Sequence, residues 1–310
     1  MSTVYTTEIL EDKLVDVLTN EDGGIRLKVA RQGAEPVSLA RRTPDGQWRG
    51  FLWRDGDLKK NPDGWNNHCT VMGYYVHRLR GERTAYLGRE VRGGTHSFLR
   101  HKLFSEPEAK GHSLVYTMAP GAYSPKEYPF RVRMKLTYTL ENSGRLLVRF
   151  DFTNQEPDQT VHVSFGLHPG FAVGSLAQAE VILPPGTYRR HLAPGNFLSG
   201  ETVDIQHPGG PMPFAKAELP GSFLLEPIGM DERKTFTVVD AAGGRRVELN
   251  CPEAPYLTLW SDGHDFICVE PCWGLPDAVN QVPFEQKAGI QEVPAGGMME
   301  RSFVIRASLI

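Results

Sequence analysis

The chain has 310 residues and a formal net charge of −3, with acidic and basic side chains nearly balanced. This balance lacks the basic footprint of a nucleic-acid-binding protein, and no apolar run approaches the roughly 20 residues that a membrane helix needs. The first residues also lack the charged and apolar regions of a secretory signal. We therefore expect a cytoplasmic protein whose partners include neither nucleic acid nor a membrane.

The four cysteines are interpreted as reduced thiols of a cytoplasmic protein. Cys268 and Cys272 lie four residues apart, and neither Cys69 nor Cys251 supplies a second pair at the spacing of a zinc site. A chain of this length also buries enough surface to fold without disulfide bonds. The cysteines therefore predict neither a zinc site nor a disulfide framework.

Period-two alternation dominates the predicted elements. The only sizeable helical candidate lies near residues 7–18, and its β-branched side chains argue against a helix. Apolar side chains then alternate with polar ones from 25 to 29. From 130 to 140 every even position is apolar and every odd position is polar, and the alternation resumes from 146 to 152 after turn residues at 142–144. This pattern predicts a hairpin. Residues 236–249 alternate as well, through the stretch 240–244.

The same pattern predicts the fold class. Glycine and proline are spread along the chain, which suits many short strands joined by tight turns. No fixed-period repeat or low-complexity tract marks a boundary. We expect one all-β domain over residues 1–310, a large antiparallel β-sandwich with few or no long helices.

The first candidate for chemistry is His168, which follows an apolar run and directly precedes Pro169. Proline favours an extended conformation in the preceding residue and interrupts regular pairing. We therefore expect His168 at the end of a strand, with its imidazole facing a cleft. An imidazole titrates near neutral pH, which suits proton transfer; the alternative is a hydrogen-bonded structural histidine.

The second candidate is Glu270, which ends the apolar run from Phe266 and precedes Pro271. A carboxylate in such a run is costly unless it is paired or functional. The alternative is a carboxylate at the rim of the protein, bonded to backbone amides. Together with His168 it supplies the two groups that an acid–base mechanism requires.

Several segments, taken in order, resemble the aldose 1-epimerase (galactose mutarotase) family, and most closely its LacX-like branch. They are Gly33–Leu39, Gly94–Arg100, Tyr128–Phe130, Gly166–Phe171, Tyr256–Gly274, Lys287–Ile290 and Pro294–Gly297. Together these segments span nearly the whole chain. The resemblance implies a single galactose mutarotase-like β-supersandwich, in agreement with the strand pattern.

The resemblance also implies an isomerase of carbohydrate metabolism that interconverts the α and β anomers of a free or phosphorylated aldose. His168 is the implied general acid, which protonates the ring oxygen. Glu270 is the implied general base, which removes the proton of the anomeric hydroxyl. Only protons move, so no metal and no other cofactor is expected. The implied partner is a small sugar or sugar phosphate, and the protein is expected to be a monomer or homodimer.

Four further residues are implied to bind the substrate. His96 would lie near the ring oxygen or a hydroxyl, and Arg78 would hydrogen-bond the sugar, although the match can slip to Arg80. Arg100 would hold an anion, with a structural ion pair as its alternative. Trp273 would stack on the apolar face of the sugar or fill the edge of the core.

Two departures from the family pattern predict an altered pocket. Ser97 stands where the family has glycine, in the loop that presents His96. Many members also place an aspartate on the sugar, and here the corresponding region offers Glu226 or Asp231 without a convincing match. Galactose or glucose is therefore not assumed to be the substrate.

Three other functions are weighed against the epimerase. A non-catalytic sugar-binding or sensing protein would retain the cleft with weakened chemistry. A sugar lyase or hydrolase is less consistent, because hydrolysis usually requires two carboxylates and only Glu270 is a firm candidate. A metal site is disfavoured because no carboxylate is spaced to complete it. Its candidate ligands would be His96, His101, His162 and His168.

Overall fold

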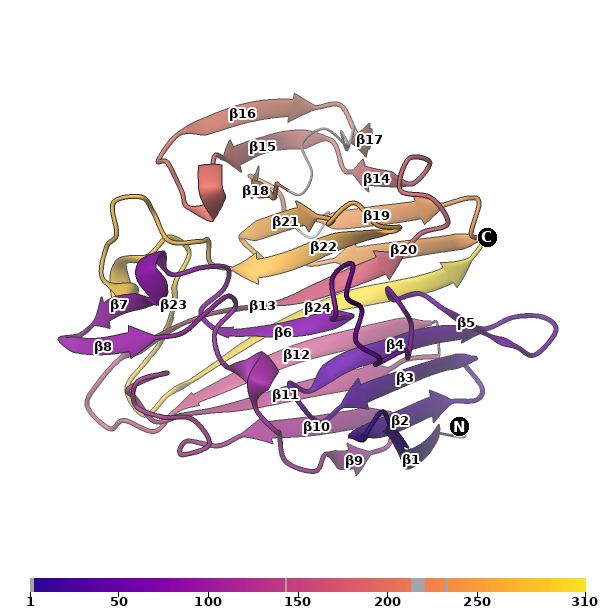
Figure 1. The fold of residues 1–310 in the computed structure, drawn as a ribbon, viewed down its shortest axis with the longest axis horizontal. Coiled ribbons are helices and arrows are strands. Elements are labelled where there is room, and N and C mark those ends of the chain that lie inside the picture. Colours follow the sequence, from indigo (N-terminus) through magenta and orange to yellow (C-terminus); the bar gives the residue numbers. More distant parts are fainter. Residues whose placement is uncertain (1–2, 143, 213–220, 232–233) are drawn as a thin grey trace.

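The computed structural model describes residues 3–142, 144–212, 221–231 and 234–310. Its strands form three large antiparallel sheets of five, nine and eight strands and one two-stranded sheet. Figure 1 shows these strands side by side, with the N-terminal sheet at the lower right and β15 and β16 above the rest. The predicted all-β architecture without long helices is confirmed.

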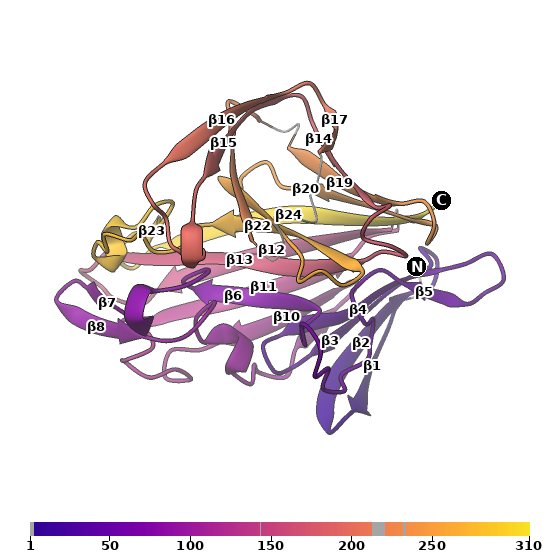
Figure 2. The ribbon, with the colours of Figure 1, turned by 45° about the horizontal axis from the view of Figure 1, so that its top comes forward.

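The N-terminal sheet has the order β1-β2-β3-β4-β5 and projects from the rest of the molecule in Figure 2. Its strands are β1 Thr3–Leu10, β2 Lys13–Asn20, β3 Ile25–Ala30, β4 Glu35–Arg42 and β5 Trp48–Gly50. The segment near 7–18 is thus a hairpin and not a helix. Its turn residues Glu11 and Asp12 both have positive φ (46° and 61°), as a tight two-residue hairpin turn requires.

The nine-stranded sheet has the order β17-β14-β19-β20-β24-β12-β11-β10-β9. Its strands are β9 Glu108–Lys110, β10 Ser113–Met118, β11 Val132–Leu140, β12 Arg145–Asn154, β14 Glu180–Leu183, β17 Gly210–Met212, β19 Thr235–Asp240, β20 Arg245–Asn250 and β24 Met298–Leu309. The predicted hairpin is present, because β11 pairs with β12, and the alternating residues 236–249 form a second pair, β19 with β20. The alternation of β12, buried at every even position, places one face on the core.

The eight-stranded sheet has the order β16-β15-β18-β21-β22-β13-β23, and β6 pairs with β13. Its strands are β6 Cys69–Tyr74, β13 Val161–Ala172, β15 Gly186–His191, β16 Thr202–His207, β18 Phe223–Ile228, β21 Tyr256–Trp260, β22 Phe266–Trp273 and β23 Gln291–Val293. Strands β13 and β22, which carry both candidate acid–base residues, lie next to each other.

The remaining elements are short. The two-stranded sheet consists of β7 Arg83–Tyr86 and β8 Arg89–Arg92, and single 3-10 turns occur at η1 Arg80–Glu82, η2 Leu99–His101, η3 Pro194–Asn196 and η5 Phe284–Gln286. Among the described residues, no helix is long and apolar enough to cross a membrane.

One cluster of buried apolar side chains joins the three large sheets. It includes Leu27 of the five-stranded sheet, Phe150 of the nine-stranded sheet and Phe165 of the eight-stranded sheet, each 0% exposed. Burying an aromatic or aliphatic side chain of this size contributes roughly 1.5–3 kcal/mol. The sheet that carries the candidate site is therefore backed by a packed core.

Candidate active site

A cleft of about 700 Å³ opens on the eight-stranded sheet. This volume lies within the range of small-molecule sites, roughly 300–1,000 Å³. Strands β13, β18, β21 and β22 contribute to its wall, together with loops that precede or follow strands. Its described lining residues are Trp65, His77, Arg78, Thr95, His96, Arg100, His168, Ala193–Asn196, Gly221, Ser222, Leu224, Trp260, Glu270 and Pro276.

His168 and Glu270 lie inside their strands, not at the strand ends as predicted. Strands β13 and β22 pair on both sides of the two residues, but no pair forms between Gly166–Cys272 and Gly170–Cys268. Gly170 donates its N–H to the β6 side of β13, so strand alternation turns the nitrogen of Pro169 toward β22. A proline cannot donate to the ladder. The prolines therefore interrupt the pairing locally without ending either strand.

The imidazole of His168 and the carboxyl group of Glu270 meet at this interruption. Nε2 of His168 lies 3.3 Å from Oε1 of Glu270, and the two residues are only 6% and 1% exposed. The other polar atoms, Nδ1 of His168 and Oε2 of Glu270, have no hydrogen-bond partner among the described residues. A buried polar atom without a hydrogen-bond partner is energetically costly. A ligand that hydrogen-bonds to these two atoms would remove that cost and bind more tightly.

Burial shifts both groups toward their uncharged forms. It lowers the pKa of His168 to about 3 and raises the pKa of Glu270 well above its usual value, because a low-dielectric site disfavours the charged form of each group. Burial therefore favours a neutral imidazole beside a protonated carboxyl group.

His96 and His77 lie beside the pair and hold each other in place. The backbone N–H of His77 donates to Nδ1 of His96 at 3.0 Å, and the backbone N–H of His96 donates to the carbonyl of His77 at 2.7 Å. Burial holds the pKa of His96 well below its usual value. A neutral imidazole that accepts at Nδ1 carries its proton on Nε2. His96 is therefore a hydrogen-bond donor at Nε2.

The two segments that carry His77 and His96 have a strained backbone. His77, His96 and Ser97 all have positive φ, near 60°, a conformation that glycine adopts more easily than other residues. Ser97 adopts this conformation although it is not a glycine. Such strain is common at functional sites.

Two tryptophans form an aromatic wall around His168. The Trp65 ring stacks on the imidazole with centroids 4.8 Å apart, and the Trp260 ring meets it edge-on at 5.6 Å. Gly170 makes the first contact possible, since a Cβ there would lie 2.6 Å from the Trp65 ring. Neither tryptophan nor His77 was among the residues predicted for the site. They lie in loops or at a strand end, where strand periodicity carries no signal.

The predicted arginines are partly resolved. Arg78 and Arg100 line the cleft, and Arg80 does not. The guanidinium of Arg80 instead donates to the carbonyl of Val279. With the Asn67 amide oxygen turned toward it, Arg100 donates to this oxygen at 3.0 Å. Two cationic side chains therefore reach the cleft.

Trp273 is not in the cleft, which contradicts its expected stacking on a sugar. It is 0% exposed and stacks on Phe165 with centroids 4.9 Å apart and an angle of 9° between the rings. The reason is strand geometry: Trp273 lies three positions after Glu270 on β22, so it points to the opposite face of the sheet. Its alternative role in the core is confirmed.

Neither candidate for the missing aspartate lines the cleft. Glu226 on β18 pairs with His191 at 2.9 Å, and Asp231 is an exposed residue beyond that strand. Among the described lining residues, Glu270 is the one acidic side chain. The cleft therefore lacks the second carboxylate that glycoside hydrolysis usually requires.

The histidines weighed as metal ligands do not gather at one point. His162 contacts Tyr86, and His101 does not line the cleft. A different set, His168, Cys268 and Glu270, has ligand atoms within 4.8 Å of one another. Burial, however, raises the pKa of the Cys268 thiol well above its usual value, which opposes the thiolate form that binds metals. All four cysteines are free, as predicted.

The sequence match agrees with this geometry. A sequence model of the family described as Aldose 1-epimerase matches residues 16–296, which include every residue of the cleft. The chain belongs to the aldose 1-epimerase family.

Relatives of this aldose 1-epimerase family member are distant. The plasmid-encoded protein LacX of Lactococcus lactis subsp. lactis is 24% identical over 248 residues, covering 74% of this chain and 80% of LacX. A galactose mutarotase related enzyme from Lactobacillus acidophilus has a TM-score of 0.81 at 21% identity, covering 98% of this chain and 97% of its own. A galactose mutarotase-like protein from Lactobacillus casei has a TM-score of 0.79 at 22% identity, covering 98% and 100%. These structures establish a galactose mutarotase-like fold.

Proposed function

We propose that the protein is an aldose 1-epimerase in which His168 acts as general acid and Glu270 as general base on the anomeric centre of an aldose. The observation that carries this proposal is the 3.3 Å contact between the two side chains in the wall of the cleft. The ring oxygen and the anomeric hydroxyl are bonded to the same carbon. Two acid–base groups this close together therefore suit two oxygens this close together.

The proton balance of the pair supports this assignment. A neutral His168 with a protonated Glu270 carries the same number of protons as an imidazolium with a carboxylate. Transfer of one proton between the groups gives the acid–base form that the reaction uses. His168 then donates to the ring oxygen while Glu270 accepts from the anomeric hydroxyl, and the ring opens. Rotation about the C1–C2 bond and closure from the other face yield the second anomer.

The surrounding residues are proposed to bind the sugar without moving its protons. The N–H at Nε2 of His96 would donate to the ring oxygen or a hydroxyl. Arg78 would hydrogen-bond hydroxyl groups at the edge of the cleft. Trp65 and Trp260 take the stacking role first expected of Trp273, because they offer aromatic surface beside the reacting pair.

The positive charge of Arg100 is relevant to whether the substrate sugar carries a phosphate group. Its guanidinium and that of Arg78 place two positive charges in a cleft whose one described carboxyl group is shifted by burial, which raises its pKa, toward the uncharged form. This balance suits an anionic substituent. The hydrogen bond from Arg100 to Asn67 leaves further N–H groups of its guanidinium for such a ligand.

The experiment that tests the proposal is anomer exchange, measured by NMR across a panel of free and phosphorylated aldoses. We expect the wild-type protein to accelerate exchange of at least one aldose. If it prefers a phosphorylated aldose, we expect the replacement of Arg100 by glutamine to weaken that preference. Saturable sugar binding without acceleration would instead identify a non-catalytic sugar-binding protein. No acceleration and no binding would refute both functions.

The pH dependence of kcat/KM is predicted to be bell-shaped with a wide plateau. The pair transfers a proton only while it holds one, so activity falls on the acid side as a second proton binds. Because burial lowers the pKa of His168 to about 3, that decline lies well below the usual histidine range. On the alkaline side, activity falls as pH rises through the raised pKa of Glu270. A decline centred near pH 6.5 on the acid side would contradict the buried, neutral state of His168.

A further inference from the structure

Arg78 enters the cleft from a segment that other residues must hold in place. Its guanidinium has no hydrogen-bond or ion-pair partner among the described residues, and its side chain is exposed. The preceding residue, His77, has a φ of 58°. A free side chain on a strained loop takes its direction from its own backbone, so the contacts of that backbone decide where the guanidinium lies.

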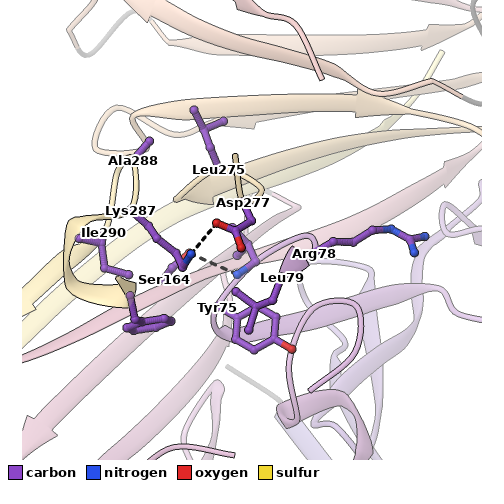
Figure 3. A pocket seen from close by; sticks show the side chains of 11 residues that line it. Tyr75, Arg78, Leu79, Ser164, Leu275, Asp277, Lys287, Ala288 and Ile290 are labelled. Carbon is purple, nitrogen blue, oxygen red and sulfur yellow. Dashed lines mark hydrogen bonds and ion pairs between the residues drawn. The ribbon is translucent and has the colours of Figure 1, made fainter. Parts of the chain in front are cut away.

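Asp277 supplies those contacts from the segment after β22. Its backbone N–H donates to the carbonyl of Arg78 at 3.0 Å, and its Oδ2 accepts from the backbone N–H of Arg80 at 3.0 Å. The two bonds bracket Leu79 and fix the peptide groups on the C-terminal side of Arg78. Figure 3 shows Asp277 beside the Arg78–Leu79 backbone, with the arginine side chain extending away from it.

Lys287 in turn holds Asp277. Its Nζ lies 2.5 Å from Oδ1 of Asp277 and donates to the carbonyl of Val282 at 3.0 Å. Gln281 adds a bond to Oδ2. Asp277 and Lys287 are only 2% and 9% exposed, and they border a cavity of about 10 Å³ (Figure 3). A buried ion pair is a weak source of stability, because desolvation offsets most of its attraction. Its presence here calls for another role.

Asp277 is also bonded to a second segment that leads to the cleft. Its carbonyl accepts from the backbone N–H of Leu198 at 2.9 Å, and Val279 donates back to the carbonyl of Leu198 at 2.9 Å. Leu198 follows the segment Ala193–Asn196, which lines the cleft. One buried residue is therefore bonded both to Arg78 and to the segment that carries Ala193–Asn196.

We propose that Asp277, held by Lys287, is a positioning residue that sets the distance between Arg78 and the Ala193–Asn196 wall and so fixes the width of the sugar site. This inference rests on the proposed function. Asp277 does not line the cleft and touches no reacting atom. Its effect on the reaction passes through residues that bind the sugar.

The test replaces Asp277 with asparagine and measures anomer exchange on the aldose that wild type accelerates most. The isosteric change keeps an oxygen that accepts from the backbone N–H of Arg80 but removes the attraction to Lys287. We expect KM to rise about tenfold with kcat within about threefold of wild type, because the lost interaction binds ground state and transition state alike. The double variant D277N/K287M removes both charges and serves if the single variant folds poorly.

A coupling measurement separates positioning from a general loss of stability. If Asp277 acts through Arg78, the KM of R78K/D277N is smaller than the product of the two single fold-changes would predict. The matched control is Asp240→Asn. Asp240 is 2% exposed and bonded to Arg245 at 3.0 Å in the nine-stranded sheet. This variant should lose stability without a change in KM. An unchanged KM in D277N, or fully multiplicative effects with R78K, overturns the proposal.

The Nε–H NMR resonance of Arg78, assigned by its loss in R78K, tests the placement without any substrate. We expect it to shift or broaden in D277N and to stay unchanged in D240N. An inactive wild-type protein would refute the epimerase function while this readout still decides the placement. An unshifted resonance in D277N would refute the placement even if the wild-type protein is active.

Discussion

Replacing Glu270 with glutamine, or His168 with asparagine, is expected to slow anomer exchange by roughly 10²-fold or more, the range for losing a general acid or base. Each change preserves much of the shape of the side chain and removes its ability to exchange a proton. The effect should appear in kcat, because the proton moves in the transition state, while KM should change little. The measurement is exchange spectroscopy at several sugar concentrations near neutral pH.

The two groups are also expected to act as one unit. Because the two side chains lie 3.3 Å apart and the proposed mechanism moves one proton through the pair, the double variant H168N/E270Q should be about as slow as the slower single variant, not slower by the product of both effects. The control is Glu226→Gln, which alters a carboxylate on strand β18 of the same sheet that pairs with His191 outside the cleft. We expect the control to retain activity within about threefold. Wild-type rates in either active-site variant would refute its assigned role.

The sheets were predictable because their signal is local. The alternation from 130 to 152 reports which side of each strand faces the core, and the observed pairing of Leu140 with Leu146 closes the hairpin at the predicted turn. The helical candidate near 7–18 was ambiguous because a short amphipathic segment fits both periods. Its β-branched residues correctly argued against a helix.

The position of the reacting pair was only half predictable. A proline after His168 does indicate interrupted pairing, but one strand alone cannot show that Pro271 interrupts the same ladder from the other side. The prediction of two strand ends was wrong for that reason. The combination of both prolines opens a gap inside the sheet, and such a gap depends on the relative register of two strands a hundred residues apart.

The orientation of Trp273 was predictable from its position in the strand. All eight residues of β22 are buried, so hydrophobicity does not distinguish its two faces. The period of two still does: Glu270 and Trp273 are three positions apart and must point in opposite directions. That inference was available from the sequence. The roles of Trp65 and His77 were not, because loop residues are positioned by contacts far away in the chain.

A fall in pH from 7 to 5 is expected to reduce the free energy of unfolding strongly, because three histidines around the cleft are buried in their neutral form. Burial lowers the pKa of His77 to about 4 and that of His168 to about 3, and holds that of His96 well below its usual value. Each therefore contributes stability that is present above about pH 6.5. This stability is lost as the pH falls, because the unfolded chain then binds a proton at that histidine and the folded chain does not. The loss is about 1.4 kcal/mol per pH unit for each histidine.

Glu270 changes the free energy of unfolding with pH in the opposite direction. Its raised pKa means that the folded protein keeps a proton that the unfolded carboxyl group has released. This contribution is fully present below about pH 4.5 and is lost as pH rises through the folded-state pKa. As the pH falls, it therefore offsets part of the stability that the three histidines lose.

Denaturant titrations at a series of pH values separate these contributions. Replacing His168 with asparagine should reduce the pH slope by about one proton, and replacing Glu270 with glutamine should increase it by about one proton. Replacing Asn196 with serine alters the cleft wall without changing a titrating group, so its slope should match that of wild type. Above the raised pKa, the glutamine variant should also be more stable than wild type, because it no longer holds a buried carboxylate. An unaltered slope in that variant would mean that Glu270 is already ionised in the folded protein. The transferable proton would then reside on His168 before any sugar binds.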